Sequence, residues 1–173
     1  MHAKISHMSQ KIDAYRTVLA RFASGVTVVS AYRDKRADGV TVSAFNALSL
    51  SPPLVLVCIG EDSDCYELLQ GSEHFAVNLL SARQASLALA FAELGDTEAL
   101  ALSGFPDLWS NDSAPLLDGS LAHIVCRRYA THTGGDHKIL IGEVIDLHLR
   151  DAVADPLLYF ASEFRQLARR DAT

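Results

Sequence analysis

Hydroxyl-bearing and small side chains gather in one stretch, between two segments that are typical of strands. The hydroxyls belong to Thr41, Ser43, Ser49 and Ser51, and Gly39 leaves room for a ligand to approach the backbone. Such a stretch can bind an anion such as phosphate through backbone N–H groups and hydroxyls. Alternatively, it is a connection whose hydroxyls satisfy their own backbone. These residues alone leave both interpretations open.

One histidine has a context that sets it apart from the other histidines. His137 follows Gly134, Gly135 and Asp136 at a predicted turn between the two longest strands. Glycines allow backbone conformations that other residues resist, and Asp136 can orient the imidazole. A histidine in a turn can equally be a solvated side chain without a role. No histidine lies in HExxH or another ligand spacing, so the sequence predicts no metal site.

Composition and missing motifs narrow the class of protein. The chain has 173 residues, close to one domain, and its 49% hydrophobic and 21% charged residues indicate a globular fold. A net charge of -6 argues against nucleic acid or an acidic membrane as a partner. Three cysteines without CxxC spacing fit a reducing cytoplasm, where we expect the protein. The motifs GxxxxGKS/T, GxGxxG and GxSxG are absent.

The start of the chain differs from the rest. It lacks the apolar core of a signal peptide, and the longest apolar run, residues 54–59, is too short to span a bilayer. We expect residues 1–12 to be a disordered or expression-derived tail and residues 13–170 to form a single domain. No repeat, low-complexity segment or linker interrupts that domain.

Hydrophobic periodicity predicts the order of the elements. The predicted strands are residues 26–31, 40–43, 54–59, 74–79, 121–133, 138–150 and 155–160. The predicted helices are residues 12–23, 65–70, 81–94 and 163–170, and the third opens with capping-box spacing. Residues 96–120 are expected to form a long loop that Phe105 and Trp109 pin. About seven strands with short connections favour a closed or nearly closed antiparallel barrel.

Five motifs together resemble the flavin reductase family of small two-component monooxygenase systems. In chain order, they are Arg21–Val29, Gly39–Phe45, Ser49–Val55, Phe75–Asn78 and Gly135–His137. Their order and spacing match the family over residues 13 to 167, nearly the whole chain. Each motif is modest alone, and their combination in one chain of this length is specific.

The resemblance implies a mainly β chain with helices, folded as an antiparallel, Greek-key-like FMN-binding split β-barrel and usually assembled as a homodimer. It implies an NAD(P)H:flavin oxidoreductase, a flavin reductase that uses NADH or NADPH to reduce FMN or FAD. Reduced flavin then passes to a separate oxygenase component. The alternatives are a non-catalytic FMN-binding split-barrel protein and a barrel kept only for interaction with other proteins.

The resemblance also implies the site residues. Those implied to bind flavin are Thr41, Val42, Ser43, Ala44, Cys58, Ile59, Gly60 and Ser63. Those implied to bind NAD(P)H are Asp136, His137 and Tyr159. No catalytic acid or base is assigned, and His137 is the candidate for positioning the nicotinamide.

Two positions depart from the family pattern. Ala44 stands where the family often has a second hydroxyl, which removes one possible donor to the flavin. Glu61 and Asp62 stand where a basic or neutral residue is common. Carboxylates beside a phosphate repel it unless they are screened or turned outward. The sequence therefore does not decide between FMN and FAD, or between NADH and NADPH.

Overall fold

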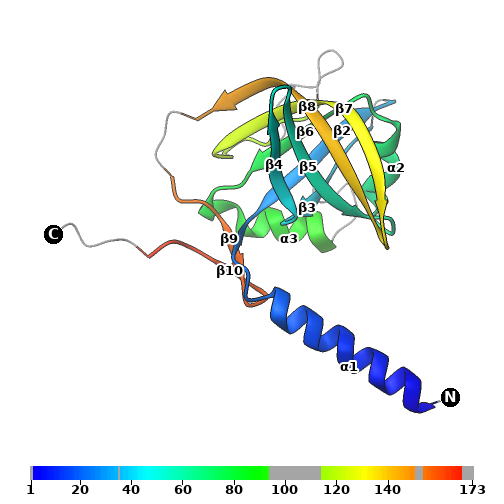
Figure 1. The fold of residues 1–173 in the computed structure, drawn as a ribbon. Helices are drawn as coiled ribbons and strands as arrows, with labels where there is room; N and C mark the ends of the chain where they lie inside the picture. The colour runs from blue at the N-terminus through cyan, green and yellow to red at the C-terminus, as the bar shows by residue number, and fades with distance from the viewer. Residues whose placement is uncertain (1, 35, 94–113, 151–153, 169–173) are drawn as a thin grey trace.

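A computed structural model describes residues 2–34, 36–93, 114–150 and 154–168. The chain forms a barrel of strands, with helices at its side and below it, and one helix projects away from it (Figure 1). The projecting helix is α1 (His2–Leu19), and the described residues also form α2 (Asp64–Gly71), the 3-10 turn η1 (Ala82–Gln84) and α3 (Ala85–Glu93). Within the described residues, no helix is both long enough and apolar enough to cross a bilayer.

Seven antiparallel strands form the main sheet. They are β2 (Thr27–Arg33), β3 (Arg36–Val42), β4 (Phe45–Leu50), β5 (Pro53–Gly60), β6 (His74–Leu79), β7 (Ala122–Gly134) and β8 (His137–Leu149). Their order in the sheet is β3-β2-β6-β7-β8-β5-β4. The edge strands β3 and β4 are consecutive in the chain, and β3 also contacts β5, so the sheet curls into the predicted antiparallel barrel.

The buried face of the sheet follows from alternation in the sequence. In β5, Val55, Val57 and Ile59 are buried, whereas the residues between them are only half-buried. These valines and Ile59 join Phe75, from β6, in the main core cluster. A second cluster forms where α3 covers β2, with Phe91 packed near Val28. The barrel therefore has one core inside it and another beneath α3.

A buried asparagine joins several parts of the fold. Asn78, on β6, is fully buried, and its amide nitrogen donates to the Val28 carbonyl oxygen (3.0 Å) and to Ser30 Oγ (2.9 Å). Its amide oxygen accepts hydrogen bonds from the Leu117 N–H (2.9 Å) and from His123 Nδ1 (2.9 Å). All the hydrogen-bonding groups of this amide are thus satisfied, as a buried polar group requires. Burial lowers the pKa of His123, and nearby His148 lowers it further.

The structure confirms most predicted elements and corrects three. The hydroxyl-rich stretch before Pro53 is strand β4 and not a loop; it escapes detection because a β-bulge between Ala47 and Ser49 breaks its alternation. Residues 2–12 are helical and not disordered, since no glycine or proline interrupts α1, while an expression-derived origin of this tail stays a prediction. The single-domain assignment stays a prediction.

The end of the chain also differs from the prediction. Residues 163–165 form strand β10 (Glu163–Arg165) and not a helix. Ala161 and Ser162 have positive φ, which turns the chain back so that β10 pairs with β9 (Leu158–Phe160). The Tyr159 and Phe164 rings contact each other edge to face, with 5.8 Å between their centroids, and this contact holds β9 and β10 together. Strand β1 (Ser24–Gly25) pairs with the other side of β9.

The remaining elements agree with the predictions where they can be compared. Residues 114–120 have no regular structure, as expected, while residues 96–113, with Phe105 and Trp109, lie outside the described residues. The capping box at Ser81 and Gln84 is formed.

Substitution of Gly142 by alanine is expected to destabilise the fold by about 1–3 kcal/mol, because its new methyl group would overpack the core. The added Cβ would lie 2.7 Å from Cys126 Cβ and closer still to the Phe75 ring. Gly25→Ala is the matched control, since nothing lies within 4 Å of a Cβ there. Urea unfolding of the two variants measures the difference, and equal midpoints would contradict the prediction.

Candidate active site

An open groove of about 910 Å³ lies between the end of α1, strand β9 and the barrel. Ser43 and Ala44 line it from the connection between β3 and β4, and Tyr159 lines it from β9. Arg16 and Phe22 line it from α1 and the residues that follow. Its volume lies within the range of roughly 300–1,000 Å³ that is typical of small-molecule sites.

Two backbone amides are available at the groove. Ser43 and Ala44 are exposed and lie between strands, and among the described residues their N–H groups find no hydrogen-bond acceptor. Consecutive free amides favour an electron-rich atom of a ligand. This part of the groove therefore offers the donors that the sequence suggested, from the backbone and not from a row of hydroxyls.

One hydrogen bond connects the groove to strand β5. The Cys58 N–H donates to the Ala44 carbonyl oxygen (3.0 Å), so that the β3–β4 connection is fixed beside β5. Two residues further along β5, Gly60 pairs with His137 at the start of β8. Two residues of strand span about 6.6 Å, so Cys58 is roughly that far from the Gly60–His137 pair.

Asp136 and His137 form the tip of the β7–β8 hairpin. His137 Nδ1 lies 2.7 Å from Asp136 Oδ1, and since a carboxylate only accepts, Nδ1 carries the proton. This hydrogen bond lowers the pKa of the Asp136 carboxyl group. His137 Nε2 lies 3.9 Å from the point where a Cβ on Gly60 would stand. The carboxylate thus orients an exposed imidazole beside the glycine of β5.

Glu61 and Asp62, the two carboxylates that depart from the family pattern, have different surroundings. Glu61 Oε1 accepts from Lys138 Nζ at 2.7 Å, and this hydrogen bond raises the pKa of the lysine. Asp62 Oδ1 lies 2.7 Å from the position of a Cβ on Gly60, on the same side as the His137 ring. Lys138 therefore screens Glu61, whereas Asp62 places its negative charge directly beside the hairpin tip.

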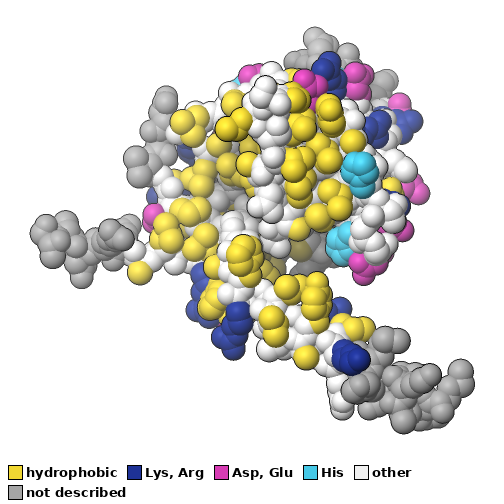
Figure 2. All heavy atoms as spheres, viewed as in Figure 1, with side chains coloured by type: hydrophobic (Ala, Val, Ile, Leu, Met, Phe, Trp, Pro, Cys, Tyr) yellow, Lys and Arg dark blue, Asp and Glu magenta, His cyan; other side chains and the backbone are white. Residues whose placement is uncertain are grey.

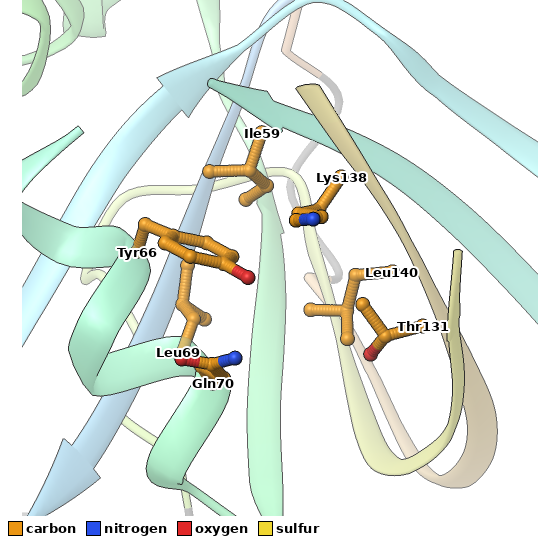
Figure 3. A pocket seen from close by; sticks show the side chains of 7 residues that line it. All are labelled: Ile59, Tyr66, Leu69, Gln70, Thr131, Lys138 and Leu140. Carbon is orange, nitrogen blue, oxygen red and sulfur yellow. The ribbon is translucent and has the colours of Figure 1, made fainter. Parts of the chain in front are cut away.

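A small cavity lies next to this pair, between α2 and strands β5, β7 and β8 (Figure 3). Its lining is Ile59, Tyr66, Leu69, Gln70, Thr131, Lys138 and Leu140. Its volume is about 10 Å³, at the lower limit for one water molecule. A dinucleotide cannot enter such a space, so this cavity is a packing gap under Lys138.

The structure separates the predicted site residues into two neighbouring groups. Ser43, Ala44 and Tyr159 share the groove, while Gly60, Ser63, Asp136 and His137 gather where β5 and β8 end. The lining of the groove does not extend to this second group. The Ala44–Cys58 hydrogen bond is the link between the two groups.

Three predicted residues have side chains that are engaged elsewhere. The Thr41 hydroxyl donates to the Ala88 carbonyl oxygen of α3 (2.7 Å), and Val42 and Ile59 are buried in the core. Ser63 precedes α2, where its N–H donates to the Gly60 carbonyl oxygen (3.2 Å), but its hydroxyl caps no helix amide. Thr41, Val42 and Ile59 are therefore engaged within the protein, and only the Ser63 side chain is left for a ligand.

A family model described as the flavin reductase like domain matches residues 19–168 of the chain. The chain belongs to this flavin reductase-like family. The FMN reductase (NADH) SmoA of Agrobacterium fabrum is 36% identical over 160 residues, covering 91% of this chain and 87% of that protein. The reductase component of 4-hydroxyphenylacetate 3-monooxygenase of Thermus thermophilus is 37% identical over 155 residues, covering 90% and 96%.

Solved structures of flavin reductases have the same fold. The NADH:FAD oxidoreductase of Streptomyces globisporus, in complex with NAD and FAD fragments, superposes with a TM-score of 0.82 at 35% identity, covering 89% of this chain and 91% of that one. This likeness confirms the split-barrel fold predicted from the sequence. Among the described residues, no three His, Cys, Asp or Glu side chains are grouped so that they could hold a metal ion.

The residues of this flavin reductase-like chain fit a flavin. The free amides at Ser43 and Ala44 suit the electron-rich edge of a ring, and the exposed side chains of Leu19 and Phe22 supply apolar surface in the same groove. Sequence reasoning assigned no role to Arg16, a cation that lines this groove. In the sequence, the feature that could have indicated a role for Arg16 at the groove is its position just before the Arg21–Val29 motif.

Thiol labelling tests the position of Cys58, the half-buried cysteine of β5. At pH 8 iodoacetamide is expected to alkylate Cys58 and to spare Cys126, because burial raises the pKa of the Cys126 thiol to about 12 and keeps it protonated. Bound FMN or FAD should slow alkylation of Cys58 several-fold, as peptide mass spectrometry can show. Labelling of Cys58 at one rate with and without flavin would remove it from the site.

Proposed function

We propose that this chain is an NADH-dependent flavin reductase that supplies reduced FMN or FAD to a separate oxygenase. The observation that supports it best is the link between the two groups of site residues. The Ala44–Cys58 hydrogen bond joins a groove with free amides to the hairpin tip that holds His137. The relatives' names, FMN reductase (NADH) and monooxygenase reductase component, support the same activity.

Bound flavin supplies an acceptor for the hydride of NADH, and this transfer requires no acid or base from the protein. The protein has to hold two flat rings in contact, about 3–3.5 Å apart. The absence of an assigned acid–base pair from the sequence is consistent with that task. The chain contributes by positioning the two rings and by placing hydrogen-bond donors where negative charge develops.

The Ser43 and Ala44 amides have the electrostatic role in this proposal. They belong to residues that line the groove and have no acceptor among the described residues, so they can donate to the ring edge that gains negative charge on reduction. Tyr159 lies across the same groove and limits where the ring can sit. The Arg16 guanidinium provides a cation for the phosphate end of the flavin.

Asp136 and His137 have the positioning role. The Asp136 carboxylate fixes His137 through Nδ1, which leaves Nε2 to meet the nicotinamide nucleotide beside Gly60. Asp62 lies on the same side of Gly60, and its negative charge would repel the 2′-phosphate that NADPH carries and NADH lacks. This arrangement favours NADH over NADPH.

His137→Ala is expected to raise the KM for NADH about tenfold, because the variant loses one hydrogen bond to a charged ligand, worth about 1.4 kcal/mol. Flavin affinity should change little, since His137 does not line the groove. Steady-state NADH oxidation with varied flavin separates the two effects. His132→Ala, an exposed residue of the same hairpin, is the control, and an unchanged KM in His137→Ala would remove His137 from the site.

One anaerobic titration tests the function itself. NADH added to the protein with FMN or FAD should bleach the flavin absorbance, and the faster flavin is the preferred acceptor. Protein that holds flavin without accelerating its reduction would be a binding module and would contradict the proposal.

We also propose that two copies of the chain form the working enzyme, as the resemblance implies.

A further inference from the structure

Most of helix α1 packs against nothing among the described residues of its own chain. Every described side chain from Gln10 to Leu19 is exposed, and the helix projects away from the barrel (Figure 1). Helices in proteins gain most of their stability from packing of an apolar face and not from the propensity of their residues. The described part of the chain thus leaves the apolar side chains of α1 open to a partner.

The exposed side chains of α1 and the turn after it follow a heptad spacing. Ile12, Tyr15, Leu19 and Phe22 recur at intervals of three, four and three residues, with 47%, 64%, 51% and 79% of their surface exposed. In the sequence, Ile5 and Met8 continue the same intervals toward the N-terminus. Such spacing produces one apolar stripe along a helix.

The barrel has an apolar surface on its outer face. Leu54 and Leu56 of β5 alternate with the buried valines, so they point outward, and Ile139 and Ile141 of β8 point outward beside them. All four are only half-buried. A solvated sheet face would normally be polar. Figure 2 shows hydrophobic side chains gathered over this part of the barrel and along the same side of α1.

We propose that α1 of one chain lies with its stripe on the outer face of β5 and β8 of a second copy, and that the second copy returns the same contact. The proposal builds on the proposed homodimer and adds the surfaces that form it. Both surfaces are present on every chain, so a twofold arrangement covers both at once.

Charge favours this pairing over contact between two α1 helices. Residues 1–22 carry four basic side chains, Lys4, Lys11, Arg16 and Arg21, against one acidic side chain, Asp13. The rest of the chain carries 11 basic and 20 acidic side chains, a net charge of -9 within the total of -6. Lys11 and Arg16 flank the stripe, so two such helices side by side would repel each other, whereas the acidic remainder of the chain attracts them.

The first experiment measures mass by light scattering. Wild-type protein is expected at twice the 18.7 kDa of one chain, and Ile12→Glu/Tyr15→Glu at the mass of one chain. Thr17→Glu, which adds one acidic side chain off the stripe, is the control and should stay dimeric. Neither Ile12 nor Tyr15 lines the groove, so NADH oxidation by the same samples reports on the function separately.

The second experiment shows which surfaces meet. Leu56→Glu/Ile141→Glu should also be monomeric, and Leu56→Thr/Ile141→Thr, which keeps a strong β-propensity, replaces it if the first variant fails to fold. Mixing the α1 variant with the sheet variant leaves one contact wholly wild-type, so a tagged copy of one should capture the other. If helix met helix and sheet met sheet, every contact in the mixture would carry a substitution and no capture would occur.

A wild-type monomer that reduces flavin would overturn this interface and leave the proposed function standing. A dimer that survives both sets of substitutions, or an absence of capture in the mixture, would also overturn it. A wild-type dimer that reduces no flavin would instead contradict the function and keep the interface.

Discussion

The antiparallel ladder between β5 and β8 is the constraint on which the site depends. It runs from Leu54 opposite Glu143 to Gly60 opposite His137 without an irregularity. Because the side-chain period of a strand is two, a slip of one residue would turn the buried valines outward and remove His137 from Gly60. The buried face of β5 thus fixes the register, and the register sets the hairpin tip beside the groove.

The same ladder explains why function requires so few specialised side chains. The amides of the β3–β4 connection are fixed because Cys58 donates to Ala44, and the imidazole is fixed because Asp136 accepts from it. The first arrangement is backbone geometry that a stable barrel supplies in any case, and the second requires only one pair of adjacent side chains. A reaction whose chemistry belongs to its cofactors needs this kind of rigid placement more than it needs reactive residues.

Sequence patterns predicted most of the fold because its strands alternate or are continuously apolar. They failed at β4, where a bulge breaks the alternation, and at β10, where two residues with positive φ build a hairpin that composition does not reveal. At the site, the Thr41 hydroxyl looked available, but its contact with α3 joins residues far apart in the chain. The Lys138–Glu61 pair escaped prediction for the same reason, since only the ladder brings these residues together.

Asn78 has a consequence for the chain that enters the barrel at Ala114. The Leu117 N–H is held by the Asn78 amide oxygen, and the Pro115 carbonyl oxygen accepts from Ser30 Oγ (2.6 Å). These two buried hydrogen bonds fix the backbone just before β7 begins. A displacement of the backbone at Pro115 or Leu117 would leave the buried Ser30 hydroxyl or the Asn78 amide oxygen short of a partner, so these two contacts determine where the chain enters the barrel.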